Sequence, residues 1–514
     1  MQTKALCLVA LCAVASPCTA IAQATATDRP LSAIDWLDNV PQSQPIVLIP
    51  DEPSVTNGAN IPNVSVTTID SPAVQIIGLV PSSVSGLPRD LWVGSDAETL
   101  STTLAEMPNL TLPAAQATLF TLLLAVADPA SGASGTFDLA RVDALIKAGA
   151  LDPALALIEQ VGPSRSPKIA QRFIDASLLN ETEDAACALI NTTPFLAPDY
   201  TYRIFCAARS GDWNTAALLF GTARALGAIT PAQNAVLERF LDPDLFEGEP
   251  SLPRPAQPNP LFFRMHEALG QPISTRSWPA IYANADLRDV AGWKTQIEAA
   301  ERLANNGVLP ANRLLGIYSE RQPAASGGIW DRVAAVQRFE TALNTGTADA
   351  IAKTLPKAWQ HMQSAGLSVP FATLFTQRLL DVDLPAHLQT AAFAVLESGA
   401  EYELATLTYP NAATQHPFRT AVAAGEVDPK LATTPLETAI ARGFSPNSAD
   451  AVLLKTAKNG ALGMALLNTL TILHAGTQGD MGQLSTALGT LRALGLEDAA
   501  RRAALQLLIA NATL

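Results

Sequence analysis

A short motif recurs where helical segments end, and it constrains the fold of this chain more than any other feature. It occurs as AGALDP (148–153), LGAITP (226–231) and AGEVDP (424–429). A glycine just past a helix adopts the left-handed backbone conformation without steric cost. Asp or Thr then caps the next helix, and proline suits the first position of that helix. Each copy therefore predicts a tight corner between two helices.

Apolar residues recur with three- and four-residue spacing from residue 97 onward. The pattern is clearest in PAAQATLFTLLLAVAD, VAGWKTQIEAAERLANN and LEDAARRAALQLLIANA, where alanine allows helices to approach closely. The corners do not recur at a fixed interval, which argues against a regular repeat array. We therefore predict a mainly α protein, an irregular α-solenoid of helical hairpins.

The amino terminus is typical of an exported protein. Residues 1–22 combine the early cation Lys4, an apolar run, and the small residues Ala20 and Ala22 at the spacing of a signal-peptidase site. We expect a signal peptide that is cleaved near Ala22, which predicts a periplasmic or secreted protein. The apolar run is too short to cross a bilayer, and no later stretch predicts an integral membrane span.

Residues 23–96 form an irregular segment that is rich in proline and small polar residues. IVLI, VSVTTI and AVQIIGLV within it predict a small patch of two or three short strands. The preceding stretch LSAIDWLDNV predicts a turn or two of amphipathic helix. This helix either folds back onto the body of the protein or docks into a partner's groove through Ile34, Trp36 and Leu37.

A proline-rich stretch interrupts the helical pattern. Residues 243–260 contain six prolines, which favour extended or polyproline II backbone over helix. We place a linker at this stretch, between a helical repeat domain over 97–242 and a second one over 261–514. The alternative is a long surface loop that crosses one continuous superhelix.

Two cysteines remain after the signal peptide is removed, Cys187 and Cys206. They lie in two consecutive helical stretches, TEDAACALI and DYTYRIFCAA, and an antiparallel hairpin would bring them level. In an oxidising compartment they form a disulfide if the helix phases match, and otherwise remain as two buried free thiols.

Charge and composition exclude several kinds of site. The formal net charge of −14 disfavours binding to nucleic acid or to anionic lipid. The five histidines are scattered without a paired motif, so we predict neither a metal site nor a cofactor. No Gly-x-Ser-x-Gly motif predicts a serine nucleophile.

One glycine-rich turn is a candidate binding patch. In RQPAASGGIWDRVAAVQRF, a Gly-Gly pair precedes a helix whose amino-terminal N–H groups could bind an anion. We favour a simple helix corner in which Ser326 caps the helix. If a ligand or partner binds an exposed patch, our first candidates are Arg321, Ser326, Gly327, Gly328 and Trp330.

Two segments resemble parts of soluble lytic transglycosylases, exported α-superhelical enzymes that cleave peptidoglycan. LESGAEYELA resembles the Glu-Ser start of that family's catalytic motif, and NGALGMALLNTL resembles its Gly-Ala-x-Gly-Leu-Met-Gln segment but lacks the Gln. The resemblance implies that Glu397 is a general acid/base.

The chain as a whole resembles uncharacterised exported α-helical periplasmic proteins of proteobacteria. The resemblance rests on SAIDWL, on the hairpin RIFCAARSGDW, which is similar to a single tetratricopeptide-type unit, and on LRALGLEDAARRAALQLL. It implies no activity. Our leading hypothesis is a scaffold that binds another envelope protein, for example in a cell-envelope or motility assembly, and is not an enzyme. The alternative is a peptidoglycan-active enzyme centred on Glu397. The sequence leaves the oligomeric state open.

Overall fold

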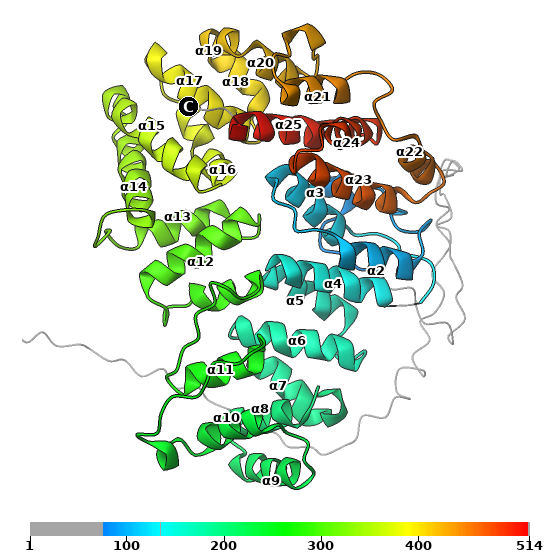
Figure 1. Ribbon diagram of the computed structural model, residues 1–514, viewed down its shortest axis with the longest axis vertical. Helices are drawn as coiled ribbons and strands as arrows, with labels where there is room; N and C mark the ends of the chain where they lie inside the picture. The colour runs from blue at the N-terminus through cyan, green and yellow to red at the C-terminus, as the bar shows by residue number, and fades with distance from the viewer. Residues whose placement is uncertain (1–75, 134, 512–514) are drawn as a thin grey trace, which may run out of the picture. The chain divides into compact units, whose positions relative to one another are not determined.

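The fold is mainly α-helical, as the sequence predicts (Figure 1). The computed structural model describes residues 76–133 and 135–511, which all belong to one compact unit, Pro72–Leu514. No strand occurs within these ranges.

The helices follow in chain order, with 3-10 helices denoted η. The first part of the chain contains α1 (Ser82–Ser85), α2 (Ala97–Glu106), α3 (Pro113–Leu124), α4 (Thr136–Ala148), α5 (Leu151–Val161), α6 (Pro167–Leu179), α7 (Glu183–Thr192), η1 (Pro194–Leu196), α8 (Tyr200–Arg209), α9 (Trp213–Ala225), α10 (Pro231–Leu241), η2 (Pro243–Phe246), α11 (Pro260–Ala268) and η3 (Ala280–Leu287). The second part contains α12 (Trp293–Asn305), α13 (Ala311–Ser319), α14 (Ile329–Thr345), α15 (Ala348–Ser364), α16 (Ser368–Leu380), α17 (Ala386–Ser398), α18 (Tyr402–Thr408), α19 (Pro410–Gln415), α20 (Pro417–Ala424), η4 (Pro429–Leu431), α21 (Pro435–Gly443), α22 (Ala451–Lys458), α23 (Leu462–Thr477), α24 (Met481–Ala493) and α25 (Glu497–Asn511).

The glycine-to-proline corners separate helices as expected, although their caps differ. Gly149, Gly227 and Gly425 all have positive φ. Thr230 forms a capping box at the start of α10, which follows the predicted scheme. In the first copy, α5 begins at Leu151, so the motif's Asp152 lies in the first turn instead of capping it. In the third copy, the Asp caps only the short helix η4.

The strand predicted over AVQIIGLV is wrong in its described part, residues 76–80. These residues form only isolated bridges, between Ile77 and Ala127 and between Val80 and Ala125. The buried guanidinium of Arg141 donates to the carbonyls of Ile77, Leu123 and Ala125, so a side chain satisfies groups that a neighbouring strand would otherwise pair. The other two strand candidates lie outside the described residues.

The two ends of the described chain pack against each other. Helices α2 and α3 contact α23 in the carboxyl-terminal part, and α3 also contacts α25 (Figure 1). The backbone N–H of Gly463 donates to the carbonyl of Leu91 at 3.0 Å. A Cβ at Gly463 would lie 2.2 Å from the ring of Trp92, so only glycine allows this approach. The chain therefore returns to its first described segment.

The buried apolar residues form two clusters. One cluster includes residues between 77 and 285 together with residues between 402 and 508. The other covers mainly 283–413. Leu237 and Leu261, on either side of the proline-rich stretch 243–260, both belong to the first cluster, and α10 contacts α11. The stretch itself is mostly exposed.

Candidate functional site

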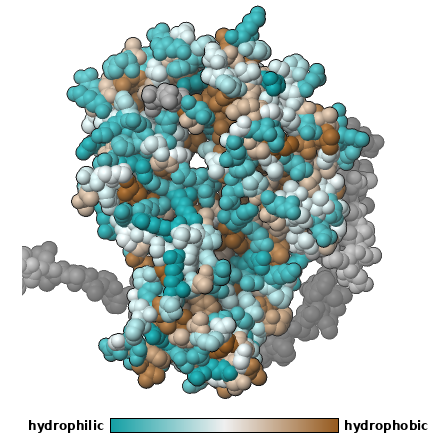
Figure 2. All heavy atoms as spheres, viewed as in Figure 1, coloured by the Kyte–Doolittle hydropathy of each residue, from teal (hydrophilic) through white to brown (hydrophobic). Residues whose placement is uncertain are grey.

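A cavity of about 880 Å³ lies where the early and late helices meet. Its walls come from the α2–α3 loop and α3, from the carboxyl-terminal ends of α4, α12 and α25, and from the α15–α16 corner. Figure 2 shows the surface hollowed near the middle of this face, where α3, α12, α16 and α25 converge in Figure 1. Much of the wall is apolar, including Leu104, Leu112, Leu119, Phe120, Val369 and Leu507.

Several helices end at this cavity, so backbone carbonyls without a helical partner converge on it. Amide side chains satisfy these carbonyls. Gln116 Nε2 donates to the carbonyl of Asn305 at 3.0 Å, and Asn306 Nδ2 donates to that of Ala148 at 3.1 Å. Asn305 Nδ2 in turn donates to the carbonyl of Ala365 at 3.0 Å.

Two further amides complete what we call the amide set. Gln363 Nε2 donates to the carbonyl of Ile509 at 3.0 Å, and Gln506 Oε1 accepts the backbone N–H of Ala114 at 2.8 Å. The amide set consists of Gln116, Asn305, Asn306, Gln363 and Gln506. Each of these bonds joins segments that are at least 60 residues apart in sequence. The amide set therefore holds the walls of the cavity together.

Among the described residues of the cavity wall, the two charged side chains, Lys147 and Arg302, are both cations. Lys147 Nζ donates to the carbonyl of Met107 at 2.7 Å, and Arg302 donates to the carbonyls of Thr275 and Trp278. Burial lowers the pKa of Arg302, and the nearby carboxylate of Asp286 opposes this effect. None of the described residues that line the cavity is Asp or Glu.

Glu397 lies beside this cavity but not in its wall. Glu397 is 1% exposed and its Oε2 accepts from Arg419 Nε at 2.8 Å, while Oε1 has no hydrogen-bond partner among the described residues. Burial raises the pKa of Glu397 to about 7, and the Arg419 charge acts in the opposite direction. The following residue, Ser398, does line the cavity. The second segment of the transglycosylase resemblance spans the start of α23, which packs on α2, α3, α22 and α24.

The glycine-rich turn at 321–328 is exposed and does not line the cavity. The predicted cap is wrong: helix α14 begins after Gly328, whose φ is +54°, and Ser326 makes no cap hydrogen bond. Arg321 lies 3.7 Å from Glu320 in an exposed ion pair. The ring of Trp330 packs on Trp293, with centroids 5.2 Å apart. Trp330 therefore packs at the margin of the core, whereas the other four residues of the candidate patch lie in the exposed turn.

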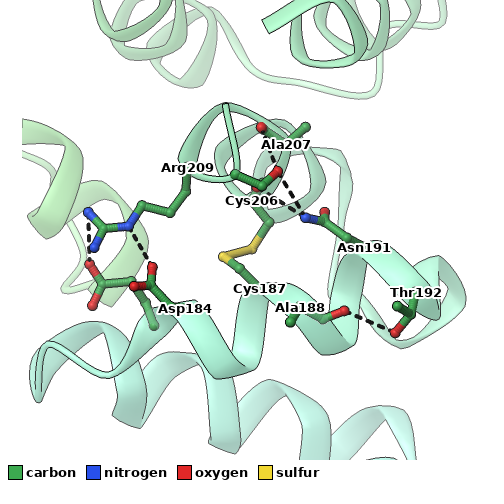
Figure 3. Close-up of a disulfide and its surroundings, with 10 residues drawn as sticks. Asp184, Cys187, Ala188, Asn191, Thr192, Cys206, Ala207 and Arg209 are labelled. Carbon is green, nitrogen blue, oxygen red and sulfur yellow. Dashed lines mark hydrogen bonds and ion pairs between the residues drawn. A yellow bond between two sulfur atoms is a disulfide. The ribbon is translucent and has the colours of Figure 1, made fainter. Parts of the chain in front are cut away.

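Cys187 and Cys206 form a disulfide between α7 and α8, with a Cα–Cα distance of 4.9 Å (Figure 3). Both cysteines are buried. Of the two alternatives that the sequence leaves open, the structure has the disulfide.

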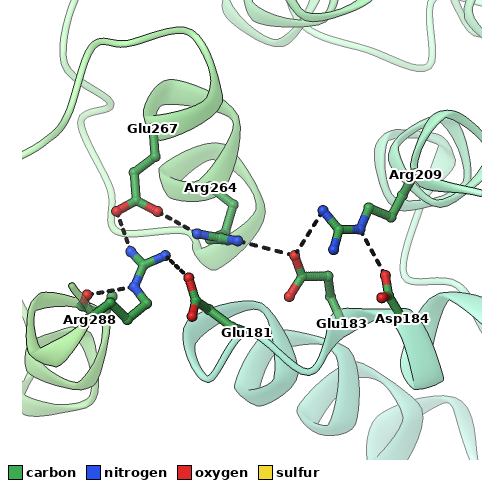
Figure 4. A network of polar contacts seen from close by, with 8 residues as sticks. Glu181, Glu183, Asp184, Arg209, Arg264, Glu267 and Arg288 are labelled. Carbon is green, nitrogen blue, oxygen red and sulfur yellow. Dashed lines mark hydrogen bonds and ion pairs between the residues drawn. The ribbon is translucent and has the colours of Figure 1, made fainter. Parts of the chain in front are cut away.

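A network of ion pairs adjoins the disulfide (Figure 4). The buried Glu183 lies 3.1 Å from Arg264 and 3.6 Å from Arg209. Arg264 also pairs with Glu267, and Glu267 pairs with Arg288. The network links α7 and α8 to α11. Sequence reasoning misses it, because its members are far apart in the chain and follow no motif.

No group of three or more His, Cys, Asp or Glu side chains within the described ranges could hold a metal ion. None of the described helices combines the length and apolar character that a membrane crossing requires. The proposed docking residues Ile34, Trp36 and Leu37 lie outside the described residues.

The comparisons give no family. Neither a family model, nor a curated protein, nor a solved structure matches this chain. Its function must therefore be inferred from its own residues.

Proposed function

We propose that this chain is a periplasmic helical protein that binds another envelope protein, and is not an enzyme. The observation that supports this proposal is a set of exposed apolar side chains on one helix. Trp213, Leu218 and the capping residue Leu226 of α9 are 53%, 71% and 66% exposed. We call these three residues the α9 face. Large exposed apolar side chains on the outer side of a helix are typical of protein-binding surfaces.

Helix α9 has little support on its outer side. It packs on α8 and α10, and only Ala216 and Ala223 of its 13 residues are buried. The helices beneath it are firmly joined, because the disulfide ties α7 to α8 and the Glu183 network ties both to α11. A rigid base loses little conformational entropy when a partner binds, which favours association.

The surroundings of α10 indicate the chemistry of the partner. Asp242, Asp244, Glu247 and Glu249 follow α10, and all four are exposed. They surround Leu245, which is 72% exposed. None of these four carboxylates forms an ion pair with another described residue. We therefore expect an apolar contact surface on the partner with lysines and arginines at its rim.

The proposed compartment rests on two observations. A disulfide persists in an oxidising environment such as the bacterial periplasm. The amino-terminal sequence is typical of an export signal.

The alternative, a peptidoglycan-cleaving enzyme, has no comparable support. A general acid must reach the glycosidic oxygen. The carboxyl group of Glu397 is instead buried against Arg419.

The test is a quantitative pull-down from an envelope extract with the mature protein as bait. The bait variant Trp213→Ala/Leu218→Ser truncates two of the three residues of the α9 face. The control Leu407→Ser/Val452→Ser truncates two apolar side chains elsewhere, which are 78% and 72% exposed. We expect wild type and the control to recover one protein in near-equal amount, and the α9 variant to recover at least about tenfold less. Equal recovery by all three baits would contradict the proposal. Circular dichroism checks that each variant is folded.

A further inference from the structure

We propose that the central cavity is a binding site for a small amphipathic anion, a molecule with one carboxylate and an apolar body. This site is separate from the α9 face and does not depend on the partner proposed above. Its volume of about 880 Å³ lies within the usual range for small-molecule pockets, roughly 300–1,000 Å³.

Apolar side chains in the cavity wall would contact the apolar body of the anion. Leu119 and Phe120 on α3, Val369 on α16 and Leu507 on α25 all line the cavity. Each of the four is only partly buried, so apolar surface remains exposed. An alkyl chain or aliphatic side chain that covered this surface would stabilise the complex through the hydrophobic effect.

The ammonium group of Lys147 would bind the carboxylate of the anion. Lys147 lies at the carboxyl-terminal end of α4 and forms no ion pair with any described residue. An ammonium group has three N–H donors, and the carbonyl of Met107 accepts only one of them. Arg302 adds positive charge to the wall, although Asp286 partly offsets it. Lys147 is therefore the principal contact for an anion.

The helix ends that converge on the cavity do not reverse its preference for an anion over a cation. Carboxyl-terminal helix ends carry partial negative charge and would favour a cation. In this cavity the amide set donates to carbonyls at the ends of α4, α12 and α25, which reduces that field. No described residue of the wall carries a carboxylate, although the chain has a net charge of −14.

The test compares three probes that share one alkyl chain: octanoate, octanol and octyltrimethylammonium. Isothermal titration calorimetry on the mature protein measures their affinities. We expect octanoate to bind at a 1:1 ratio, octanol to bind more weakly, and octyltrimethylammonium not to bind. Lys147→Met should weaken octanoate about tenfold and leave octanol unchanged, because it removes only the charged contact.

A second pair of variants locates the site. Val369→Trp places a large ring against the apolar wall of the cavity and should weaken octanoate binding at least about tenfold. Val452→Trp, on the exposed side of α22, should bind as wild type does. The proposal is overturned if octanoate does not bind, if the cationic probe binds equally well, or if Val369→Trp retains wild-type affinity.

Discussion

Glu397 illustrates how single buried charges are accommodated in this protein. Glu397 is buried on α17, and its one charged partner among the described residues is Arg419. The guanidinium of Arg419 lies over the ring of Phe393. Asp175 is a second example, because burial raises its pKa to about 6 even though Tyr202 donates to it at 2.6 Å. In both residues the cost of burial exceeds the stabilisation that the partner gives to the charged form.

The raised pKa of Glu397 makes stability depend on pH. The folded state binds its proton up to about pH 7, whereas the unfolded state releases it near the ordinary pKa of 4.5. The folded state therefore holds more protons between these values, and the free energy of unfolding falls as pH rises through this window. The expected slope is about 1.4 kcal/mol per pH unit from this one group.

We expect Glu397→Gln to remove this slope, because glutamine still accepts from Arg419 but cannot ionise. The measurement is the free energy of unfolding in guanidinium between pH 5 and 7, with the exposed Glu159→Gln as control. Parallel pH curves for wild type and Glu397→Gln would show that the carboxyl group has an ordinary pKa.

Residue-level predictions from sequence succeed where one local interaction decides the outcome. Thr230 caps α10 as predicted, because the capping box needs only residues 230–233. Ser326 fails as a cap, because Gly328 adopts a positive φ that starts α14 two residues later. The sequence indicates that a glycine turn is present, but not that both Gly327 and Gly328 adopt positive φ and so delay the start of the helix.

At the scale of the elements, the hairpin of α7 and α8 depends on its cross-link. Sequence spacing brings Cys187 and Cys206 to the same level, but the turn η1 between the helices sets their relative phase. Pairing could therefore be suggested from sequence and not settled by it. The mostly exposed helix α9 is stacked on this hairpin, so its position depends on the same bond.

We expect the variant Cys187→Ala/Cys206→Ala to be less stable by about 3 kcal/mol, because the disulfide closes a loop with a sequence separation of 19 residues. Guanidinium unfolding followed by circular dichroism measures the change. Dithiothreitol should destabilise wild type by a similar amount and leave the variant unchanged. An unfolding curve of wild type that does not respond to reduction would contradict this account.

Over the whole described chain, the helix content can be predicted from local periodicity. Chain closure, by which we mean the packing of α2 and α3 against α23 and α25, cannot be predicted in this way. The bond between Ala114 and Gln506 spans 392 residues, and no sequence pattern relates the two positions. The members of the amide set are also ordinary polar residues in sequence. The cavity exists only because these distant segments meet, so it could not be predicted.

Cross-linking of α2 to α23 tests chain closure most directly. Thr103 Oγ1 and Met464 Sδ are 3.6 Å apart, and both side chains are partly exposed. The variant Thr103→Cys/Met464→Cys is treated with a short bis-maleimide, and the products are identified by peptide mass spectrometry. Each single-cysteine variant serves as control. We expect an intramolecular cross-link between positions 103 and 464 in high yield at low protein concentration. Two separately labelled cysteines without a cross-link would contradict the closed arrangement and the cavity that depends on it.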